Sequence, residues 1–366
     1  MKDKNHKRTH RSKVNQDMLE KFTLYYQNIR GVKSKWNSLK NLIMEKQPVM
    51  VALVETHLNE HDTLEEVPGY KVIRRERKIA EGGGIAIFYK TKLEGLITLL
   101  PTCEQHTDKV VWIKVANTRI SIKIGIVYMP QESLTPKQEL QSIYNTFGAE
   151  IEKSLIGEER IMMVGDFNCR IGEKIKGNET TVSKGGKMMQ KMMTKYDLLL
   201  INGTEKCEGL WTRQEGASRS VLDYAIIKKE DLRYLSKMKI DEERNECPYA
   251  VRSQQGGKIL YSDHNVIEVA MDWLKLVKDQ NQSARSGVTR KGYERFERQC
   301  REVQISNMIG EADTIQDDYT RWSTKVKEML KENETKIKQR TSTNKIIKTL
   351  TKIEKGIRQT LRKVKN

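Results

Sequence analysis

The feature that most constrains the fold of this chain is a series of short apolar runs, several of which follow one another without a helix-length segment between them. The runs occupy residues 22–27, 49–54, 85–89, 110–115, 120–127, 161–164, 198–201, 210–212, 220–227 and 265–271. Short runs rich in β-branched and aromatic residues are typical of strands. A purely parallel, doubly wound sheet needs a crossover after each strand. The sequence therefore predicts a mixed-sheet sandwich covered by helices.

The segments between the runs supply a few helices. Residues 36–44 carry apolar side chains on one helical face, the segment 135–156 is also expected to be helical, and a third helix should follow the polar loop 171–187. With 366 residues, the chain is long enough for one large α/β domain, which we expect at 15–275.

The ends of the chain differ from its body in charge. Residues 1–14 hold six Lys/Arg and one Asp, a net charge of +5, and residues 321–366 hold 15 Lys/Arg and four Glu, a net charge of +11. The body, 15–320, keeps only +2 of the total of +18. Basic ends on a near-neutral body suggest arms that bind a polyanion, most simply nucleic acid. The alternative is a pair of solvated tails that keep the protein soluble.

The character of the chain also changes beyond Trp273. Residues 276–292 have little apolar content and are expected to form a linker, and 293–366 are expected to form a basic helical extension. An amphipathic stripe repeats every three or four residues in this extension, formed by Ile346, Leu350, Ile353, Ile357, Leu361 and Val364. Docking on a protein partner, a short coiled coil and a nucleic-acid-binding arm all fit this stripe.

Several classes of protein are excluded. No stretch approaches roughly 18 uninterrupted apolar residues, so no transmembrane helix and no membrane partner are expected, and the basic, polar N-terminus has no secretory signal. The five cysteines have neither paired spacing nor a zinc pattern, so they are expected to be reduced thiols. We expect an intracellular protein, nuclear or cytoplasmic.

Polar residues suited to phosphate or metal chemistry follow several of the apolar runs. They are Asn28, Glu55, Tyr128, Asp166, Asn168, Asp223, Asp263 and His264. Ligand sites in α/β folds gather at strand ends, so these residues can share one pocket. A cluster of carboxylates is tolerated where a divalent cation neutralises it, and hard oxygen ligands favour Mg²⁺ or Mn²⁺.

Each of these residues also has a structural explanation when it is considered alone. Glu55 could stabilise the start of a helix, Asn28, Asp166 and Asn168 could form turns, and Asp223 could pair with Arg219. The order of the whole set along the chain is what favours a functional interpretation.

Seven short motifs carry that order across residues 22–272. They are Gln27-Asn28-Ile29-Arg30-Gly31, Val54-Glu55-Thr56-His57-Leu58, Gly83-Gly84-Ile85-Ala86-Ile87, Val127-Tyr128-Met129-Pro130, Gly165-Asp166-Phe167-Asn168, Leu222-Asp223-Tyr224 and Ser262-Asp263-His264. The series resembles the endonuclease/exonuclease/phosphatase superfamily. Within it, the sequence looks most like the endonuclease domain of non-LTR (LINE-type) retrotransposons and craniofacial development protein 2-like proteins.

The resemblance implies a deoxyribonuclease-like, four-layer α/β sandwich, with two mixed β-sheets flanked by helices, followed here by the C-terminal helical extension. It also implies a magnesium- or manganese-dependent site in which Glu55 ligates the metal and Asn28 and Asp263 help to bind or position it.

The resemblance also implies the catalytic roles. Asp166 would orient or deprotonate the attacking water, and Asn168 and Tyr128 would hold the scissile phosphate. His264, paired with Asp223 or with the neighbouring Asp263, would bind the phosphate or act in proton transfer.

Three further residues, Arg30, Thr212 and Arg213, are candidates for contacts with the DNA backbone because they are hydrogen-bond donors next to the motifs. They could equally be ordinary surface residues. AP endonucleases carry an acid where this sequence has Arg30, which favours a retrotransposon-type nickase. The segment beyond Trp273 is too short for the reverse transcriptase of full elements, so we expect an endonuclease alone.

The function expected from the resemblance is hydrolysis of a phosphodiester in DNA, nicking one strand. Two alternatives remain at this point. One is a phosphodiesterase of the same fold that acts on RNA or a phospholipid head group. The other is a catalytically silent, domesticated nucleic-acid-binding protein.

The basic tail generates a first prediction. Deleting residues 321–366 should weaken binding to duplex DNA and leave the chemical step largely intact, because all the motifs precede this segment. For every phosphate that the truncated chain no longer binds, the slope of log K against log[salt] should fall by roughly 0.9. Titrations of the full and truncated chains at several salt concentrations measure both slopes, and identical slopes would assign the tail to solvent or to a protein partner.

Overall fold

The structure is a computed structural model. It describes residues 21–76, 83–102, 109–117, 120–155, 160–172, 181–252, 258–283, 286–288, 324 and 334–336. The chain forms two compact units, Met1–Lys275 and Leu276–Asn366. The predicted arm 1–14 and nearly all of the predicted extension 293–366 lie outside the described residues.

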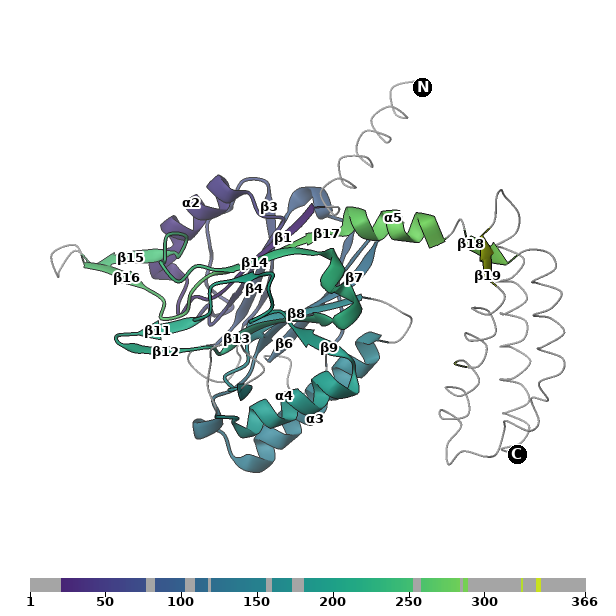
Figure 1. Ribbon diagram of the computed structural model, residues 1–366. Helices are drawn as coiled ribbons and strands as arrows, with labels where there is room; N and C mark the ends of the chain where they lie inside the picture. Colours follow the sequence, from purple (N-terminus) through teal and green to yellow (C-terminus); the bar gives the residue numbers. More distant parts are fainter. Residues whose placement is uncertain are drawn as a thin grey trace, which may run out of the picture. The chain divides into compact units, whose positions relative to one another are not determined.

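The first unit contains two large mixed sheets (Figure 1). One has seven strands in the order β10-β14-β17-β1-β2-β4-β3. Their bounds are β1 Lys21–Asn28, β2 Met50–Val54, β3 Tyr70–Arg75, β4 Ile85–Lys90, β10 Cys207–Glu208, β14 Leu235–Ile240 and β17 Ile267–Asp272. The β1–β2 and β10–β14 pairs are parallel, and the other pairs are antiparallel.

The second sheet has six strands in the order β5-β6-β7-β8-β13-β9. Their bounds are β5 Ile97–Leu99, β6 Val110–Ala116, β7 Ser121–Tyr128, β8 Arg160–Asp166, β9 Leu198–Leu200 and β13 Asp223–Lys228. Only β7 and β8 run parallel in this sheet. Two hairpins stand outside both sheets, namely β11 (Arg213–Glu215) with β12 (Ser218–Ser220), and β15 (Tyr249–Arg252) with β16 (Lys258–Tyr261).

Helices cover the outer face of each sheet. Helix α2 (Trp36–Lys46) packs Trp36, Leu39 and Ile43 against the seven-stranded sheet. Helices α3 (Lys137–Leu155) and α4 (Lys184–Lys195) cover the six-stranded sheet, and α4 contributes the methionines Met189, Met192 and Met193. The remaining short helices are η1 Lys33–Lys35, η2 Thr91–Leu93, η4 Glu132–Leu134 and η6 Lys229–Tyr234.

The two sheets pack against each other through their inner faces, where β1 contacts β8 and β2 contacts β7. Alternate residues of these strands point into this interface and are buried, among them Leu24, Ala52, Ile124, Ile126, Met162 and Val164. Burial on both faces explains why these strands form continuous apolar runs in the sequence. The predicted four-layer α/β sandwich is confirmed.

Some elements differ from the sequence-based expectation. The expected run 220–227 is divided between β12 and β13, and 210–212 is not a strand. Strand β14 was not predicted, because a bulge between Leu235 and Lys237 breaks its alternation of apolar and polar residues. Helix α5 (Trp273–Ser283) covers part of the segment expected to be a linker, and β18 (Ser286–Val288) pairs with β19 (Glu334–Lys336). None of the described helices is long and apolar enough to span a bilayer.

The parallel β7–β8 pair leaves no space for a side chain at Gly165, which lies opposite Val127. A Cβ on Gly165 would lie 2.0 Å from the carbonyl oxygen of Val127. Gly165→Ala should therefore lower the free energy of unfolding by at least about 1–3 kcal/mol, as overpacked sites do. Urea denaturation monitored by tryptophan fluorescence measures the change.

Gly148 in helix α3 is the matched control. A Cβ there would meet only the flexible side chain of Met192, at 3.4 Å from Sδ. Gly148→Ala should raise the stability by roughly 0.5–1 kcal/mol, because glycine is a poor helix former. If Gly165→Ala unfolds with the same free energy as wild type, the two strands can move apart around the added methyl group without loss of stability.

Candidate functional site

The strand ends of both sheets meet at one edge of the sandwich. Parallel pairing places Asn28 beside Val54, so that Asn28 and Glu55 end adjacent strands of the first sheet. In the second sheet, Asp166 lies opposite both Tyr128 and Asp223. The predicted motif residues therefore converge because of strand register, although they are far apart in sequence.

Asn28 joins the two sheets at this edge. Its buried amide Nδ2 donates to Oε1 of Glu55 and to Oδ2 of Asp166, each at 3.0 Å. The hydroxyl of Tyr128 donates to the same oxygen of Glu55 at 2.8 Å. Glu55 thus receives two hydrogen bonds on one oxygen, while Oε2 lies 3.6 Å from Nε2 of His57.

Asp166 is held by neutral donors. The backbone N–H of Asn168 donates to Oδ1 at 2.9 Å, and the Asn168 side-chain amide donates to Oδ2 at 3.2 Å and to the carbonyl of Met129 at 2.9 Å. Burial and the nearby charge of Asp223 raise the pKa of Asp166 to about 7, although His264 and the amide donors oppose this shift. Asp166 can therefore change protonation near neutral pH.

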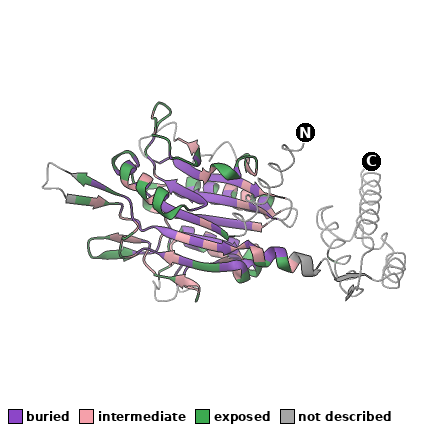
Figure 2. Ribbon diagram, turned by 90° about the horizontal axis from the view of Figure 1, so that it is seen from above, coloured by how far each residue is buried: buried purple, intermediate pink, exposed green. Residues whose placement is uncertain are grey.

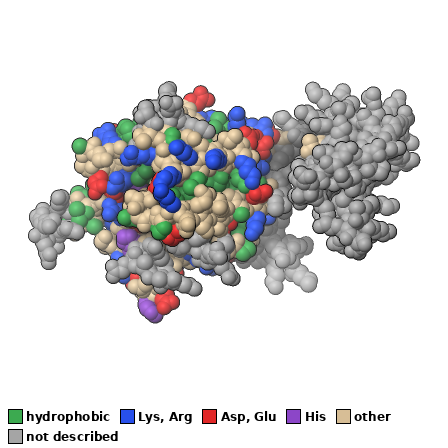
Figure 3. Space-filling view, turned by 90° about the horizontal axis from the view of Figure 1, so that it is seen from below, with side chains coloured by type: hydrophobic (Ala, Val, Ile, Leu, Met, Phe, Trp, Pro, Cys, Tyr) green, Lys and Arg blue, Asp and Glu red, His purple; other side chains and the backbone are tan. Residues whose placement is uncertain are grey.

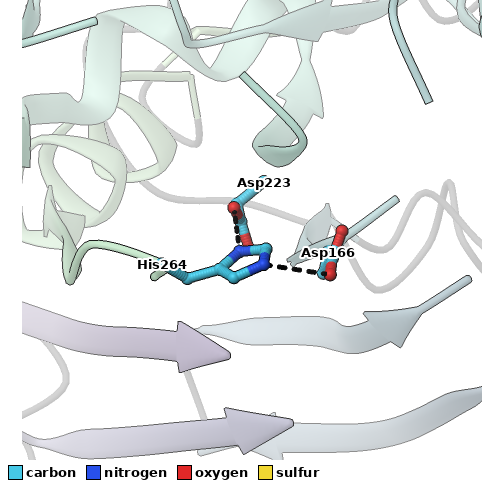
Figure 4. A group of neighbouring side chains, drawn as sticks. All are labelled: Asp166, Asp223 and His264. Atoms are coloured by element: carbon cyan, nitrogen blue, oxygen red, sulfur yellow. Dashed lines mark hydrogen bonds and ion pairs between the residues drawn. The ribbon is translucent and has the colours of Figure 1, made fainter. Parts of the chain in front are cut away.

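His264 lies between two carboxylates (Figure 4). Its Nδ1 is 2.8 Å from Oδ2 of Asp223, and its Nε2 is 3.8 Å from Oδ2 of Asp166. Burial lowers the pKa of His264, but the charges of Asp223 and Asp166 outweigh that effect and raise it to about 9. The imidazole is therefore a cation at neutral pH, and Asp166, Asp223 and His264 form a compact buried group suited to charge stabilisation.

Asp223 is itself fixed by residues around it. The buried hydroxyl of Tyr26 donates to Oδ1 at 2.9 Å. Thr212 Oγ1 accepts from the backbone N–H groups of Leu222 and Asp223 at 2.9 and 3.0 Å. The Thr212 side chain is completely buried, so it supports the Asp223 strand and does not offer the DNA contact that its position in the sequence suggested.

Asp263 is engaged by two arginines. Its Oδ1 lies 3.0 Å from Nη1 of Arg30, and its Oδ2 accepts from Nε of Arg213 at 2.7 Å. Burial tends to raise the pKa of Asp263, but His264 and the two guanidinium groups hold it below its usual value. Each oxygen therefore lies beside a guanidinium group that would compete with a cation for Asp263.

The turns after β1 and β2 adopt an unusual backbone. Arg30, Glu55 and His57 have φ of 45°, 52° and 52°, in the left-handed region. The turns are joined because Gly31 N–H donates to Glu55 O at 2.8 Å and Val32 N–H donates to Thr56 O at 3.0 Å, and the first turn is also held by Lys35 Nζ, which donates to Arg30 O at 2.9 Å. Strained backbone of this kind costs free energy and is typical of functional sites.

These residues line one cleft of about 820 Å³. Its lining includes Arg30, Glu55, Asp166, Asn168, Arg213, Asp263 and His264 from the predicted set, together with Gln131, Glu132, Ser133, Arg170, Thr181, Ser183, Lys184 and Leu222. Asn28 and Asp223 lie behind this lining and are fully buried. Sequence reasoning missed the supporting hydroxyls of Tyr26 and Ser262. The Ser262 hydroxyl donates to Asn28 O at 2.6 Å. Its place next to Asp263 in the sequence is the feature that could have indicated this supporting role.

Comparison with known proteins identifies the fold. No family model matches the sequence, and no curated protein matches it significantly. Among solved structures, the chain is similar to the endonuclease domain of TRAS1, a telomere-specific non-LTR retrotransposon. The two share 14% sequence identity and superpose with a TM-score of 0.51, and the match covers 69% of this chain and 98% of the TRAS1 domain. It is also similar to the AP endonuclease LMAP from Leishmania major (14% identity, 69% and 88% coverage, TM-score 0.55).

A third similar structure is the 3′-5′ exonuclease NExo from Neisseria meningitidis, with 14% identity, 69% and 100% coverage and a TM-score of 0.52. The two mixed sheets with flanking helices of this chain match the fold of the TRAS1 endonuclease domain and of LMAP. The chain therefore has the endonuclease/exonuclease/phosphatase fold.

Proposed function

We propose that this protein is a phosphodiesterase that uses Mg²⁺ or Mn²⁺ to nick one strand of DNA. The observation that carries the proposal is the convergence of Glu55, Asp166 and the His264–Asp223 pair at one cleft. A carboxylate able to accept a proton and a cation able to bind an anionic oxygen are what phosphodiester hydrolysis requires.

Asp166 is the base in this proposal. Burial and the charge of Asp223 raise its pKa, which makes it a stronger base than an ordinary carboxylate and suits it to accept a proton from an attacking water. The amides of Asn28 and Asn168 hold its two oxygens. They fix its position without neutralising it.

The His264–Asp223 pair supplies positive charge for the phosphate. Asp223 binds Nδ1, which leaves Nε2–H as a charged donor at the side of Asp166. A fixed donor of this kind stabilises charge that accumulates on phosphate oxygens in the transition state. Asn168, which lines the cleft, and Tyr128, bonded to Glu55, complete the phosphate-binding group.

Glu55 is the carboxylate best suited to a metal ion. It lines the cleft, and one of its oxygens is fixed by Asn28 and Tyr128. The other makes no hydrogen bond with the described residues and lies 3.6 Å from Nε2 of His57. Mg²⁺ commonly binds through one or two carboxylates, with water and substrate phosphate as the other ligands. When bound, the ion would neutralise charge on the phosphate oxygens as a Lewis acid.

Charge on the surface favours a polyanionic substrate. Helix α4 begins at the cleft and exposes Lys184, Lys187, Lys191 and Lys195, and it contains no acidic residue. Lys and Arg side chains are prominent on the face of the molecule shown in Figure 3. A related structure, the 3′ phosphatase NExo from Neisseria, is bound to a product DNA hairpin. These observations favour DNA as the substrate.

The decisive experiment is a supercoiled-plasmid nicking assay with Mg²⁺ and with EDTA. Asp166→Asn should lower the rate by about 10²–10⁴, because it removes the base and keeps the shape. The control Asp272→Asn removes a carboxylate that only approaches Lys275, and it should nick at the wild-type rate. Wild-type activity in folded Asp166→Asn would refute the proposed role. Parallel hydrolysis assays with RNA and with phosphoinositide substrates measure the alternative phosphodiesterase activities.

Glu55→Gln tests the metal site separately. The amide keeps the acceptor for Asn28 and Tyr128 but removes the negative charge, so the half-saturating Mn²⁺ concentration should rise on the order of 10-fold or more. Mn²⁺ binding can be followed directly by electron paramagnetic resonance, without catalysis. Glu139→Gln, at an exposed position in α3, is the control. Equal Mn²⁺ affinity in all three proteins would leave Glu55 with only a structural role at the turn.

A further inference from the structure

The β15–β16 hairpin displays an apolar face that nothing described in its own unit covers. Tyr249 pairs with Tyr261 and Val251 with Ile259, so all four side chains share one face. Their exposed fractions are 41%, 37%, 58% and 49%. They account for half of the exposed large apolar side chains among the described residues.

The opposite face of the hairpin is used for packing. Ala250 and Leu260 lie on it, Ala250 is buried, and β15 contacts η1 and α2. The hairpin is therefore anchored on one side and open on the other. A group of large apolar side chains exposed together is uncommon and marks an interaction surface.

The base of the hairpin is tied to the catalytic edge. Strand β16 leads directly into Ser262, Asp263 and His264. This segment is bonded to β11, since Gln214 N–H donates to Asp263 O at 2.7 Å and Asn265 N–H donates to Thr212 O at 2.8 Å. In Figures 1 and 2, the β15–β16 and β11–β12 hairpins project from the same side of the body.

Arg244 strengthens this connection. Its guanidinium lies 5.8 Å from the centre of the Tyr261 ring, and its Nη2 donates to Gln214 O at 2.6 Å. The Tyr249 and Tyr261 rings meet edge to face at 6.0 Å. Through Arg244, the apolar face is therefore connected to the backbone of Gln214, which is itself bonded to Asp263 on the cleft lining.

The residue types of the hairpin favour nucleic acid as the partner that binds its apolar face. Residues 249–261 include Arg252 and Lys258 and no acidic residue. Aromatic and β-branched side chains on a segment whose sequence carries basic but no acidic residues are suited to nucleic acid, because bases offer apolar faces and phosphates offer negative charge. Strand β16 is followed by Asp263 and His264, which line the cleft, so DNA that extends from the cleaved bond along this segment would meet the surface.

We propose that the apolar face of the β15–β16 hairpin, formed by Tyr249, Val251, Ile259 and Tyr261, binds the bases of duplex DNA next to the phosphodiester cleaved in the cleft. This inference rests on the proposed DNA-nicking function and assigns part of its substrate recognition. The contact is apolar, so it contributes affinity that does not depend on salt.

The test compares Val251→Ser/Ile259→Ser with wild type in binding to a fluorescent DNA duplex, in EDTA so that no cleavage occurs. The double variant should bind about 10-fold more weakly, the order expected when the apolar packing against a base is removed. The slope of log K against log[salt] should stay unchanged, because no charge is removed. In nicking assays, KM should rise while kcat stays near wild type, since the contact acts on binding.

Val72→Ser is the matched control, because Val72 is a β-branched residue of β3 with a similar exposed fraction of 42%. It should bind DNA as wild type does. Thermal unfolding checks that each variant is folded, and Tyr249→Ser replaces the double variant if that protein does not fold.

The outcomes separate this inference from the proposed function. Wild-type protein that neither binds nor nicks DNA would defeat the proposed function and the hairpin assignment together. Wild-type protein that nicks DNA, with a hairpin variant that binds like Val72→Ser, would overturn the hairpin assignment alone. Loss of self-association in sedimentation, with unchanged DNA affinity, would also overturn it and identify the face as an interface between copies of this chain.

Discussion

Two buried carboxylates at one edge of the sandwich set the electrostatics of the whole site. Asp166 and Asp223 are 1% and 0% exposed and lie opposite each other on neighbouring strands. Ionised carboxylates are costly to bury without partners, and His264 between them supplies the positive charge. Tyr26, Asn28 and Asn168 supply neutral hydrogen bonds, which satisfy the oxygens without cancelling their charge.

This arrangement has a consequence for proton binding. The pKa of His264 rises from 6.5 to about 9 and that of Asp166 from 3.8 to about 7. Between the lowest and the highest of these pKa values, the folded protein therefore binds more protons than the unfolded chain does. The stability that Asp166 and His264 contribute falls as pH rises through this range. For His264 the contribution is complete below about pH 6.5 and disappears as pH passes through 9. At neutral pH His264 keeps its charge, and at alkaline pH the stability that the two raised pKa values contribute is lost.

Much of this site follows from the sequence because strand ends carry a local signal. An apolar run that stops at Asn28, Glu55 or Asp166 can be recognised from the chain alone, and sheet register then brings these residues together. The sequence carries no such local signal for which side chain each of these residues will contact. Asp223 has Arg219 close by in sequence but binds His264, 41 residues away. Thr212 has the donor chemistry of a DNA contact, and only the structure reveals that it is buried beneath Asp223.

The elements that the sequence did not predict are those whose residues do not alternate or are not buried. A bulge interrupts β14, and β15 and β16 are short strands with one face open to solvent. The hairpin therefore lacks the core-forming pattern on which sequence reasoning depends, although it lies directly before Asp263 and His264.

The two arginines on Asp263 divide the cleft into regions of different charge. Arg30 and Arg213 neutralise Asp263, so the other carboxylates on the cleft lining are those of Glu55, Glu132 and Asp166. In the proposed reaction, a divalent cation would be attracted to Glu55, while the guanidinium groups would favour a phosphate oxygen. A phosphodiester between the two regions would contact a cation on one side and arginine on the other, and the left-handed turn that carries Arg30 is held by a hydrogen bond from Lys35.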